Sequence, residues 1–340
     1  MSGGWHRAWR AAAVLAVAAL IAGCGGQKAE PAGRPLHVGM VFDVGGLGDK
    51  SFNDLAYQGL VRARDELGIT FEYFEPTQSS DREAALRLFA QGDANLVIGV
   101  GFLFSDDIRA VARDFPEKQF VCIDYSWTEG QEVPPNLVGL KFREEEGSFL
   151  VGALAAMVSA TGAIGFVGGM DIPLIHKFEA GYRAGATRER PDIRVLVNYA
   201  GVTGDAFKNP SKGKELALAQ FAQGADVIYH ASGSTGLGVF EAAREKGKLA
   251  IGVDADQSAE APGLILTSMI KRVDLVVYEE VARAKEGRFQ GGVRILGLKE
   301  HGVDYVRNET NARWITPERQ ARLEALTRAI ADGTIKVPSE

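Results

Sequence analysis

The first candidates for chemistry in this sequence are the acidic and aromatic residues of the glycine-rich stretch 43–59, DVGGLGDKSFNDLAYQG. The stretch has neither the GxxxxGK[ST] nor the GxGxxG spacing, so it predicts no site for a nucleoside triphosphate or a dinucleotide. Carboxylates on a glycine-shaped turn can instead accept hydrogen bonds from vicinal hydroxyls, such as those of a ribose, and a phenyl ring can cover a flat ring. One alternative stays open: Asp49 or Ser51 caps the following helix while Phe52 packs in the core.

The elements that must position these residues follow an alternating pattern of short apolar runs and helix-length amphipathic segments. This alternation predicts parallel sheets built from βαβ units. The pattern begins again near residue 144, which indicates a second α/β unit. Strands are expected at 36–42, 71–75, 95–101, 119–124, 136–142, 163–169, 194–200, 226–232, 249–256, 264–270, 291–298 and 304–307. Helices are expected at 51–67, 81–91, 105–115, 144–160, 175–189, 211–223, 238–246, 274–286 and 317–332.

Aspartates and glycines end several of these expected strands. Because ligands of open α/β sheets bind beyond the carboxyl ends of the strands, we expect these residues to converge on one cleft. The residues at the strand ends are Asp43, Gly101, Asp124, Gly168, Gly169, Ser232, Gly233 and Asp254.

Composition limits the possible function classes. The chain has 340 residues and a formal net charge of -6, typical of a globular protein of about two domains. No basic patch indicates a nucleic-acid partner. Clustered aspartates could serve acid-base catalysis or bind a metal, but the sequence has no GxSxG, HExxH or CxxC motif. We therefore expect a binding protein and no enzyme, with neither a metal nor a cofactor.

The N-terminus has the features of a bacterial lipoprotein signal peptide, which we expect to span residues 1–23. Basic residues precede the apolar run AAAVLAVAALIAG, which is short for a membrane span, and Ile21-Ala22-Gly23-Cys24 resembles a lipobox. A lipid on Cys24 would anchor the chain to a membrane without crossing it. Residues 24–35 are expected to be a flexible tether. Cys122, the other of two cysteines, is expected to be buried, with no disulfide.

Several stretches together resemble the basic membrane protein family of substrate-binding lipoproteins, of the purine nucleoside receptor type, whose members serve ABC importers. The stretches are DVGGLGDKSFN, GFVGGMDIPLIHKFEAGYRAGA, NPSKGKELA, ASGSTGLGVFEAA, IGVDADQ and LTSMIKRVD, in this order along nearly the whole chain after Cys24. The resemblance implies a type I periplasmic-binding-protein-like fold, with two α/β lobes that close on a ligand. We expect residues 36–141 and 265–292 in the N-terminal lobe, and 142–264 and 293–338 in the C-terminal lobe.

The resemblance also implies a nucleoside site, with a purine as the expected base. Phe52 and Phe207 would stack on the base and Asp254 would bind its edge. The ribose would be held by Asp43, Asp49, Asp124, Gly233 and Lys271, and Asn53 is counted with the ligand-binding residues. The loop around Phe207, GVTGDAFKNPSKGK, departs from the GSFNDPAKGK usual in relatives. A lone His176 is expected at the surface.

The implied partners are an ABC permease with its ATPase, and a bacterial membrane through the lipid on Cys24. The protein would then lie in the cell envelope as a monomer, facing the periplasm or the exterior. Two alternatives stay open: a ligand sensor for a membrane receptor, or the same fold binding another heterocycle such as riboflavin. The cluster of carboxylates predicts that nucleosides bind and that their monophosphates do not.

Overall fold

The structure is a computed structural model that describes residues 35–78 and 81–340. Residues 35–340 belong to one compact unit. The expected signal peptide, Cys24 and most of the tether lie outside the described residues. Within the described part of the chain, no helix combines the length and the apolar character that a membrane span needs.

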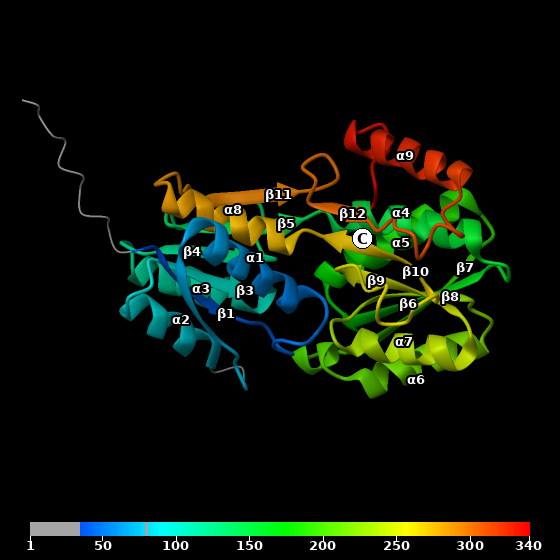
Figure 1. The fold of residues 1–340 in the computed structure, drawn as a ribbon, viewed down its shortest axis with the longest axis horizontal. Helices are drawn as coiled ribbons and strands as arrows, with labels where there is room; N and C mark the ends of the chain where they lie inside the picture. Colours follow the sequence, from blue (N-terminus) through cyan, green and yellow to red (C-terminus); the bar gives the residue numbers. More distant parts are fainter. Residues whose placement is uncertain (1–34, 79–80) are drawn as a thin grey trace, which may run out of the picture. The chain divides into compact units, whose positions relative to one another are not determined.

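The N-terminal lobe is built on a six-stranded sheet with the order β11-β5-β4-β3-β1-β2 (Figure 1). Every neighbouring pair in this sheet is parallel. Its strands are β1 (His37–Val41), β2 (Thr70–Phe74), β3 (Leu96–Val100), β4 (Gln119–Ile123), β5 (Leu137–Phe142) and β11 (Gly292–Leu296). Its helices are α1 (Phe52–Leu67), α2 (Asp81–Gln91), α3 (Ser105–Asp114) and α8 (Val273–Lys285), which packs against α1.

The C-terminal lobe repeats this architecture around a second six-stranded sheet with the order β12-β10-β9-β8-β6-β7. The pairs are parallel except for β12, which runs antiparallel to β10. The strands are β6 (Ala163–Met170), β7 (Arg194–Gly201), β8 (Val227–Ala231), β9 (Leu249–Asp254), β10 (Ile265–Lys271) and β12 (Val303–Tyr305). The helices are α4 (Glu144–Val158), α5 (Pro173–Glu189), α6 (Pro210–Ala222), α7 (Thr235–Lys246) and α9 (Pro317–Ala331).

The expected strands and helices are all present, and so is the expected α/β fold with two sheets, which are parallel except for the edge strand β12. Two short 3₁₀ turns, η1 (Phe102–Phe104) and η2 (Gly204–Phe207), were not predicted. Such turns leave little trace in a sequence because they contain only about one turn of periodic pattern. Both turns follow the carboxyl end of a strand and carry a phenylalanine toward the space between the lobes.

The chain crosses between the lobes at three places, and two of them differ from the expected boundaries. Strand β10 was expected in the N-terminal lobe but pairs with β9, and β11 was expected to lie largely in the C-terminal lobe but pairs with β5. The crossovers therefore follow Phe142, Lys271 and Leu296. An apolar run such as 264–270 shows that a strand is buried, but it does not show which sheet the strand joins.

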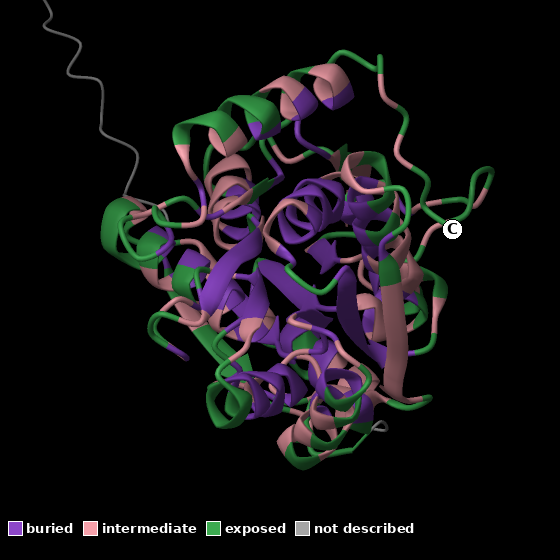
Figure 2. Cartoon of the chain, turned by 90° about the vertical axis from the view of Figure 1, so that its right-hand side faces the viewer, coloured by how far each residue is buried: buried purple, intermediate pink, exposed green. Residues whose placement is uncertain are grey.

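The central strands of both sheets are buried, whereas the outer faces of the helices are exposed, as Figure 2 shows. Strands buried on both faces read as continuous apolar runs, because helices cover both faces of a parallel sheet. Cys122 lies within this core and is fully buried, as expected. The two sheets present the carboxyl ends of their parallel strands to the space between the lobes, where the candidate residues gather.

Candidate functional site

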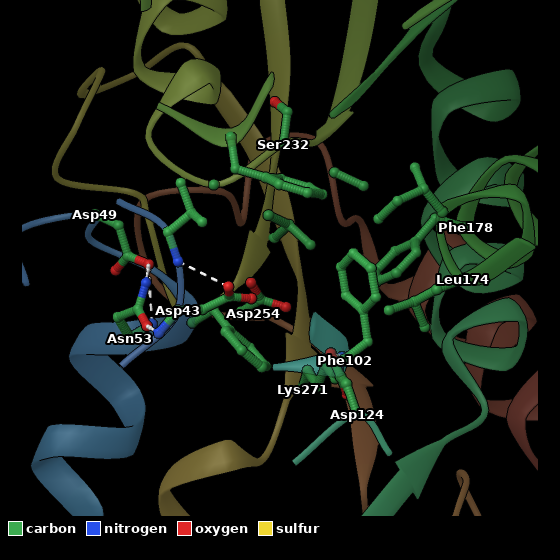
Figure 3. A pocket seen from close by; sticks show the side chains of 17 residues that line it. Asp43, Asp49, Asn53, Phe102, Asp124, Leu174, Phe178, Ser232, Asp254 and Lys271 are labelled. Atoms are coloured by element: carbon green, nitrogen blue, oxygen red, sulfur yellow. Dashed lines mark hydrogen bonds and ion pairs between the residues drawn. The ribbon is translucent and has the colours of Figure 1, made fainter. Parts of the chain in front are cut away.

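A cavity between the lobes brings together residues from the ends of β1, β4, β8, β9 and β10. In Figure 3, Asp43, Asp49 and Asn53 lie on one side and Phe102, Leu174 and Phe178 on the other, with Asp254 between them. All nine residues proposed from the sequence as ligand-binding line this cavity: Asp43, Asp49, Phe52, Asn53, Asp124, Phe207, Gly233, Asp254 and Lys271. Their contact with a ligand stays a prediction.

The loop before α1 is organised by Asp49, whose carboxylate is buried. Its Oδ1 accepts hydrogen bonds from the backbone N–H of Ser51 at 2.9 Å and of Asp54 at 3.2 Å. Its Oδ2 accepts from the backbone N–H and the side-chain amide of Asn53, at 2.9 and 3.1 Å. A carboxylate has about four acceptor positions, so these four donors occupy them. Asp49 therefore serves the start of the helix, as in the alternative left open above.

Asp43 follows β1 and is fixed by its own loop. Its Oδ1 accepts a hydrogen bond from the Val44 N–H at 2.7 Å, and its backbone N–H donates to Asn53 Oδ1 at 3.1 Å. A Cβ on Gly101, which has a φ of 106°, would overlap the Asp43 carboxylate. Burial raises the pKa of Asp43 to about 7. The glycine at the end of β3 is therefore needed for the position of this carboxyl group.

Asp124 directly follows β4 and Asp254 ends β9, and both lie in the left-handed backbone region, with φ values of 59° and 65°. This conformation is uncommon for residues other than glycine, although aspartate tolerates it better than most, and it is enriched at functional sites. Burial raises the pKa of Asp254 to about 7, against the opposing effect of the Lys271 ammonium. The backbone thus turns both carboxyl groups into the cavity at a conformational cost.

Lys271 holds a buried cluster of charges at the base of the cavity. Its ammonium lies 2.6 Å from Asp124 Oδ2 and 3.0 Å from Glu144 Oε1, and Lys177 also pairs with Glu144. Burial lowers the pKa of Lys271, but the Asp124 and Glu144 carboxylates outweigh burial and hold that pKa above its ordinary value. The Nζ atom also lies between 4.9 and 5.7 Å from the ring centroids of Phe52, Phe142 and Phe178. Lys271 is therefore a buried counter-ion as well as a lining residue.

One acceptor in this cluster is not used by the protein. Among residues 35–78 and 81–340, the buried Oδ1 atom of Asp124 has no hydrogen-bond partner. A buried polar atom without a partner is costly, and in a cavity it suits a ligand that donates a hydrogen bond.

Aromatic residues line both sides of the cavity. Phe52 begins α1 in the N-terminal lobe, and Phe207 belongs to η2 in the C-terminal lobe. The loop of Phe207 is tied to the start of α7, because the Ser234 hydroxyl donates to the Phe207 carbonyl at 3.0 Å. The ring lies on the backbone of Gly169, where any Cβ would overlap it. This anchoring gives the loop a definite place despite its departure from the usual pattern.

Sequence reasoning missed the apolar wall formed by Phe102 of η1 and by Leu174, Ile175 and Phe178 of α5. Phe102 directly follows a glycine at a strand end, a signal that could have indicated it. The α5 residues gave no such signal, since apolar residues at helical spacing usually form core. His176 lies outside the cavity, half-exposed and 2.7 Å from Asp171, as expected for a surface residue.

The arrangement suits binding more than catalysis or metal chemistry. Within the described residues, no group of three or more His, Cys, Asp or Glu side chains has the geometry to hold a metal ion. The titratable lining comprises four aspartates and one lysine, flanked by phenyl rings. Carboxylates beside aromatic faces are suited to a neutral ligand that combines a flat ring with hydrogen-bond donors.

Comparison with known proteins identifies the family. Residues 36–340 match the family described as ABC transporter substrate-binding protein PnrA-like. The chain is 38% identical over 307 residues to an uncharacterized lipoprotein of Pyrococcus abyssi, covering 86% of this chain and 74% of that protein. It is 35% identical over 319 residues to basic membrane protein A of Borreliella afzelii, covering 93% and 95%.

A solved structure agrees with this assignment. The ABC transporter solute-binding protein from Aeropyrum pernix K1 superposes with a TM-score of 0.83 and 32% identity, covering 90% of this chain and 94% of that chain. The fold is therefore that of the type I periplasmic solute-binding proteins, as expected, and the family is one of binding proteins and not of enzymes. The chain belongs to the PnrA-like family of ABC transporter substrate-binding proteins.

Proposed function

We propose that this protein binds a purine nucleoside between its lobes and delivers it to an ABC permease with its ATPase, while a lipid on Cys24 holds it at the membrane. The observation that carries the proposal is the joining of carboxyl groups and phenyl rings from both lobes in one cavity. A nucleoside matches this lining, because it offers a flat base, ring N–H or amino donors and vicinal hydroxyls.

The acceptors left free by the protein support a ligand rich in donors. Asp124 Oδ1 has no hydrogen-bond partner within the described residues, and Asp43 and Asp254 each use one oxygen in hydrogen bonds to the protein. We assign the ribose hydroxyls to Asp43 and Asp124, and the donors of the base to Asp254. Lys271 neutralises Asp124 from beneath. We assign Asp49 the task of shaping the loop, since its acceptor positions are already filled.

The charge balance of the cavity argues against nucleotides. Its lining carries four aspartates and a single lysine, and that lysine already contacts two carboxylates. A phosphate placed within a few ångströms of these carboxylates would be repelled, and each such contact costs about 4 kcal/mol at 4 Å for a protein-like dielectric of about 20. The nucleoside is therefore the proposed ligand, and its monophosphate is excluded.

The lining of the cavity indicates that the lobes move. Asp43 and Phe52 belong to the N-terminal lobe, whereas Phe207 and Asp254 belong to the C-terminal lobe. A ligand held between these side chains would be covered from both sides. Binding therefore requires the lobes to part and to close again around the ligand, so that the closed state reports occupancy to the permease.

The experiment is a calorimetric titration of the soluble chain that starts at Gly25, refolded to strip any carried ligand. Adenosine, guanosine, inosine, cytidine and uridine are compared, with guanosine monophosphate and riboflavin alongside. We expect tight binding of purine nucleosides and none of the monophosphate.

Two variants locate the site. Phe207→Ala and Asp254→Asn should each weaken binding at least tenfold, the cost of a lost stacking or charged hydrogen-bond partner. The matched control is Phe74→Ala, because Phe74 lies exposed on the edge strand β2, away from the cavity. Heat from riboflavin alone, or from nucleoside and monophosphate equally, would refute the assignment. No heat from a folded protein would refute it too, and mass spectrometry of co-purified material would then identify the ligand.

A further inference from the structure

Ser51, at the start of α1 in the N-terminal lobe, contacts the end of β9 in the C-terminal lobe. Its Oγ lies 2.6 Å from Asp254 Oδ2 and 3.2 Å from the Val253 carbonyl oxygen. The serine is fully buried and, although it occupies the N-cap position, its side chain makes no capping hydrogen bond. Asp49 satisfies the backbone N–H groups there instead. The Ser51 hydroxyl therefore does not cap its own helix and can donate its proton to the opposite lobe.

A second contact joins the same two segments. The side-chain Nε2 of Gln257, in the C-terminal lobe, donates to the Lys50 carbonyl oxygen of the N-terminal lobe at 3.1 Å. Lys50 is held in the left-handed region with a φ of 55°, at the point of contact. The two contacts thus join neighbouring parts of the two lobes. Lys50 and Ser51 are consecutive in the loop before α1, and their partners lie at the end of β9 and just after it.

The orientation of the Gln257 amide is set inside the C-terminal lobe. Its Oε1 accepts from the Val253 N–H at 2.8 Å and lies 3.1 Å from His230 Nε2. Burial lowers the pKa of His230 to about 4, so the ring beside the Gln257 oxygen is neutral. Because the Val253 N–H can only donate, Oε1 must be the atom that faces it, and the amide nitrogen faces the other lobe. The C-terminal lobe therefore orients the Gln257 donor toward the Lys50 carbonyl through its own hydrogen bonds.

We propose that Ser51 is a positioning residue for Asp254 and that, together with the Gln257 to Lys50 contact, it forms an interlobe latch. The inference rests on the proposed function in one respect, that Asp254 contacts the ligand. The Ser51 hydroxyl has a single proton, and an O–H to carboxylate distance of 2.6 Å is typical of a charge-assisted bond. Ser51 thus occupies Oδ2 and leaves Oδ1 of Asp254 for the ligand, in a geometry that exists only when the lobes are closed.

The charged and titratable surroundings of Asp254 come from several elements. They are Lys271 of β10, Asp124 directly after β4, Asp49 of the loop before α1 and Tyr229 of β8. Lys271 and the Ser51 hydroxyl favour the ionised form of Asp254, whereas burial and the two aspartates disfavour it. Removing the hydroxyl should therefore raise the pKa of Asp254, and ligand affinity should begin to fall at a higher pH as the solution is acidified.

The first test compares Ser51→Ala with Ser51→Thr and with a matched control, Ser258→Ala. Ser258 also bonds an aspartate, Asp256, but within one lobe. Guanosine affinity is measured by calorimetry from pH 5.5 to 8.5. We expect Ser51→Ala to lose about tenfold in affinity at pH 8 and to shift the pH profile upward, with recovery in Ser51→Thr and no change in Ser258→Ala. Equal effects of Ser51→Ala and Ser258→Ala, or an unshifted pH profile, would overturn the proposal.

The second test does not depend on the ligand. Spin labels on the exposed Leu88 of α2 and Val202 after β7, introduced as Leu88→Cys and Val202→Cys, report the distance between the lobes. The buried Cys122 is not labelled, and Cys24 is absent from the chain that starts at Gly25. In the ligand-free protein, Ser51→Ala should move the distance distribution toward open lobes. Identical distributions would overturn the latch, whereas a failure of nucleosides to bind would refute only the proposed function.

Discussion

Replacement of Lys271 by methionine is the sharpest test of how the base of the cavity is held together. The Lys271 side chain is 2% exposed, and its ammonium contacts Asp124 Oδ2 at 2.6 Å and Glu144 Oε1 at 3.0 Å. Methionine keeps most of the apolar contacts with the surrounding phenyl rings but removes the charge. Glu144 retains Lys177 as a partner, so the loss falls mainly on Asp124.

The expected size of the effect follows from the burial of this pair. Removing one partner of a buried ion pair costs about 3–5 kcal/mol, because the other charge stays buried without compensation. We take the lower end, about 3 kcal/mol, since the phenyl contacts of the side chain are kept. A loss of this size lowers the melting temperature of a chain of this length by roughly 5 °C.

The effect should also depend on pH, which separates charge from packing. In Lys271→Met, the folded-state pKa of Asp124 is raised further by burial, since the lysine no longer opposes it. When the pKa of an aspartate is higher in the folded than in the unfolded state, its contribution to the free energy of unfolding is fully present below the unfolded-state pKa of about 3.9. This contribution is lost as the pH rises through the folded-state pKa. The loss in free energy of unfolding, relative to the unmodified protein, should therefore be smaller at pH 5 than at pH 8.

The assay is differential scanning calorimetry of the ligand-free protein at both pH values. The control is Lys246→Met, which removes a lysine from a surface pair with Glu245, where both side chains are nearly half exposed. That change should cost less than about 1 kcal/mol at either pH. A Lys271→Met variant that melts like the control, or that loses the same amount at pH 5 and pH 8, would refute the counter-ion role.

Three further predictions concern the carboxyl groups, the glycine turn and the anchor. Because the pKa values of Asp43 and Asp254 are about 7, nucleoside affinity should fall between pH 8 and pH 6. The ligand-free protein should gain stability over that range, since raised folded pKa values make neutral carboxyls favourable; a flat calorimetric profile would contradict this. Gly101→Ala should weaken binding at least tenfold because its Cβ overlaps the Asp43 carboxyl, whereas Gly130→Ala, with a similar φ of 86° and open space around it, should not. Cys24→Ser should abolish palmitate labelling and release the protein from the membrane fraction; continued labelling would show that the lipid is attached elsewhere.

The sequence predicts the elements of this fold well, because fully buried parallel strands leave continuous apolar runs and their covering helices leave amphipathic ones. It does not predict sheet membership, which is why 265–271 was expected in the wrong lobe. Nor does it predict the left-handed conformations of Asp124 and Asp254, since these are imposed by the surrounding structure and not by local preference.

The candidate site could be predicted as a set of residues but not as a set of contacts. The strand-end rule and the family resemblance named nine residues, and all of them line one cavity. Neither shows that the acceptor positions of Asp49 are filled by its own helix start, or that Lys271 is paired with Asp124 and Glu144. Which donors and acceptors pair depends on differences in distance of a few tenths of an ångström. Only the tertiary structure gives these distances.

The exchange of strands between the lobes also sets an order for folding. The first sheet receives its edge strand β11 and its covering helix α8 only after the chain has passed through most of the second sheet. Until residues 273–296 have been synthesised, the face of α1 around Gly59, against which Val277 packs, has no cover. We expect nascent chains that end at residue 264 to be digested by protease in both halves. A chain that folds late in synthesis can still pass unfolded through a narrow translocation channel, which suits the proposed role as an exported lipoprotein.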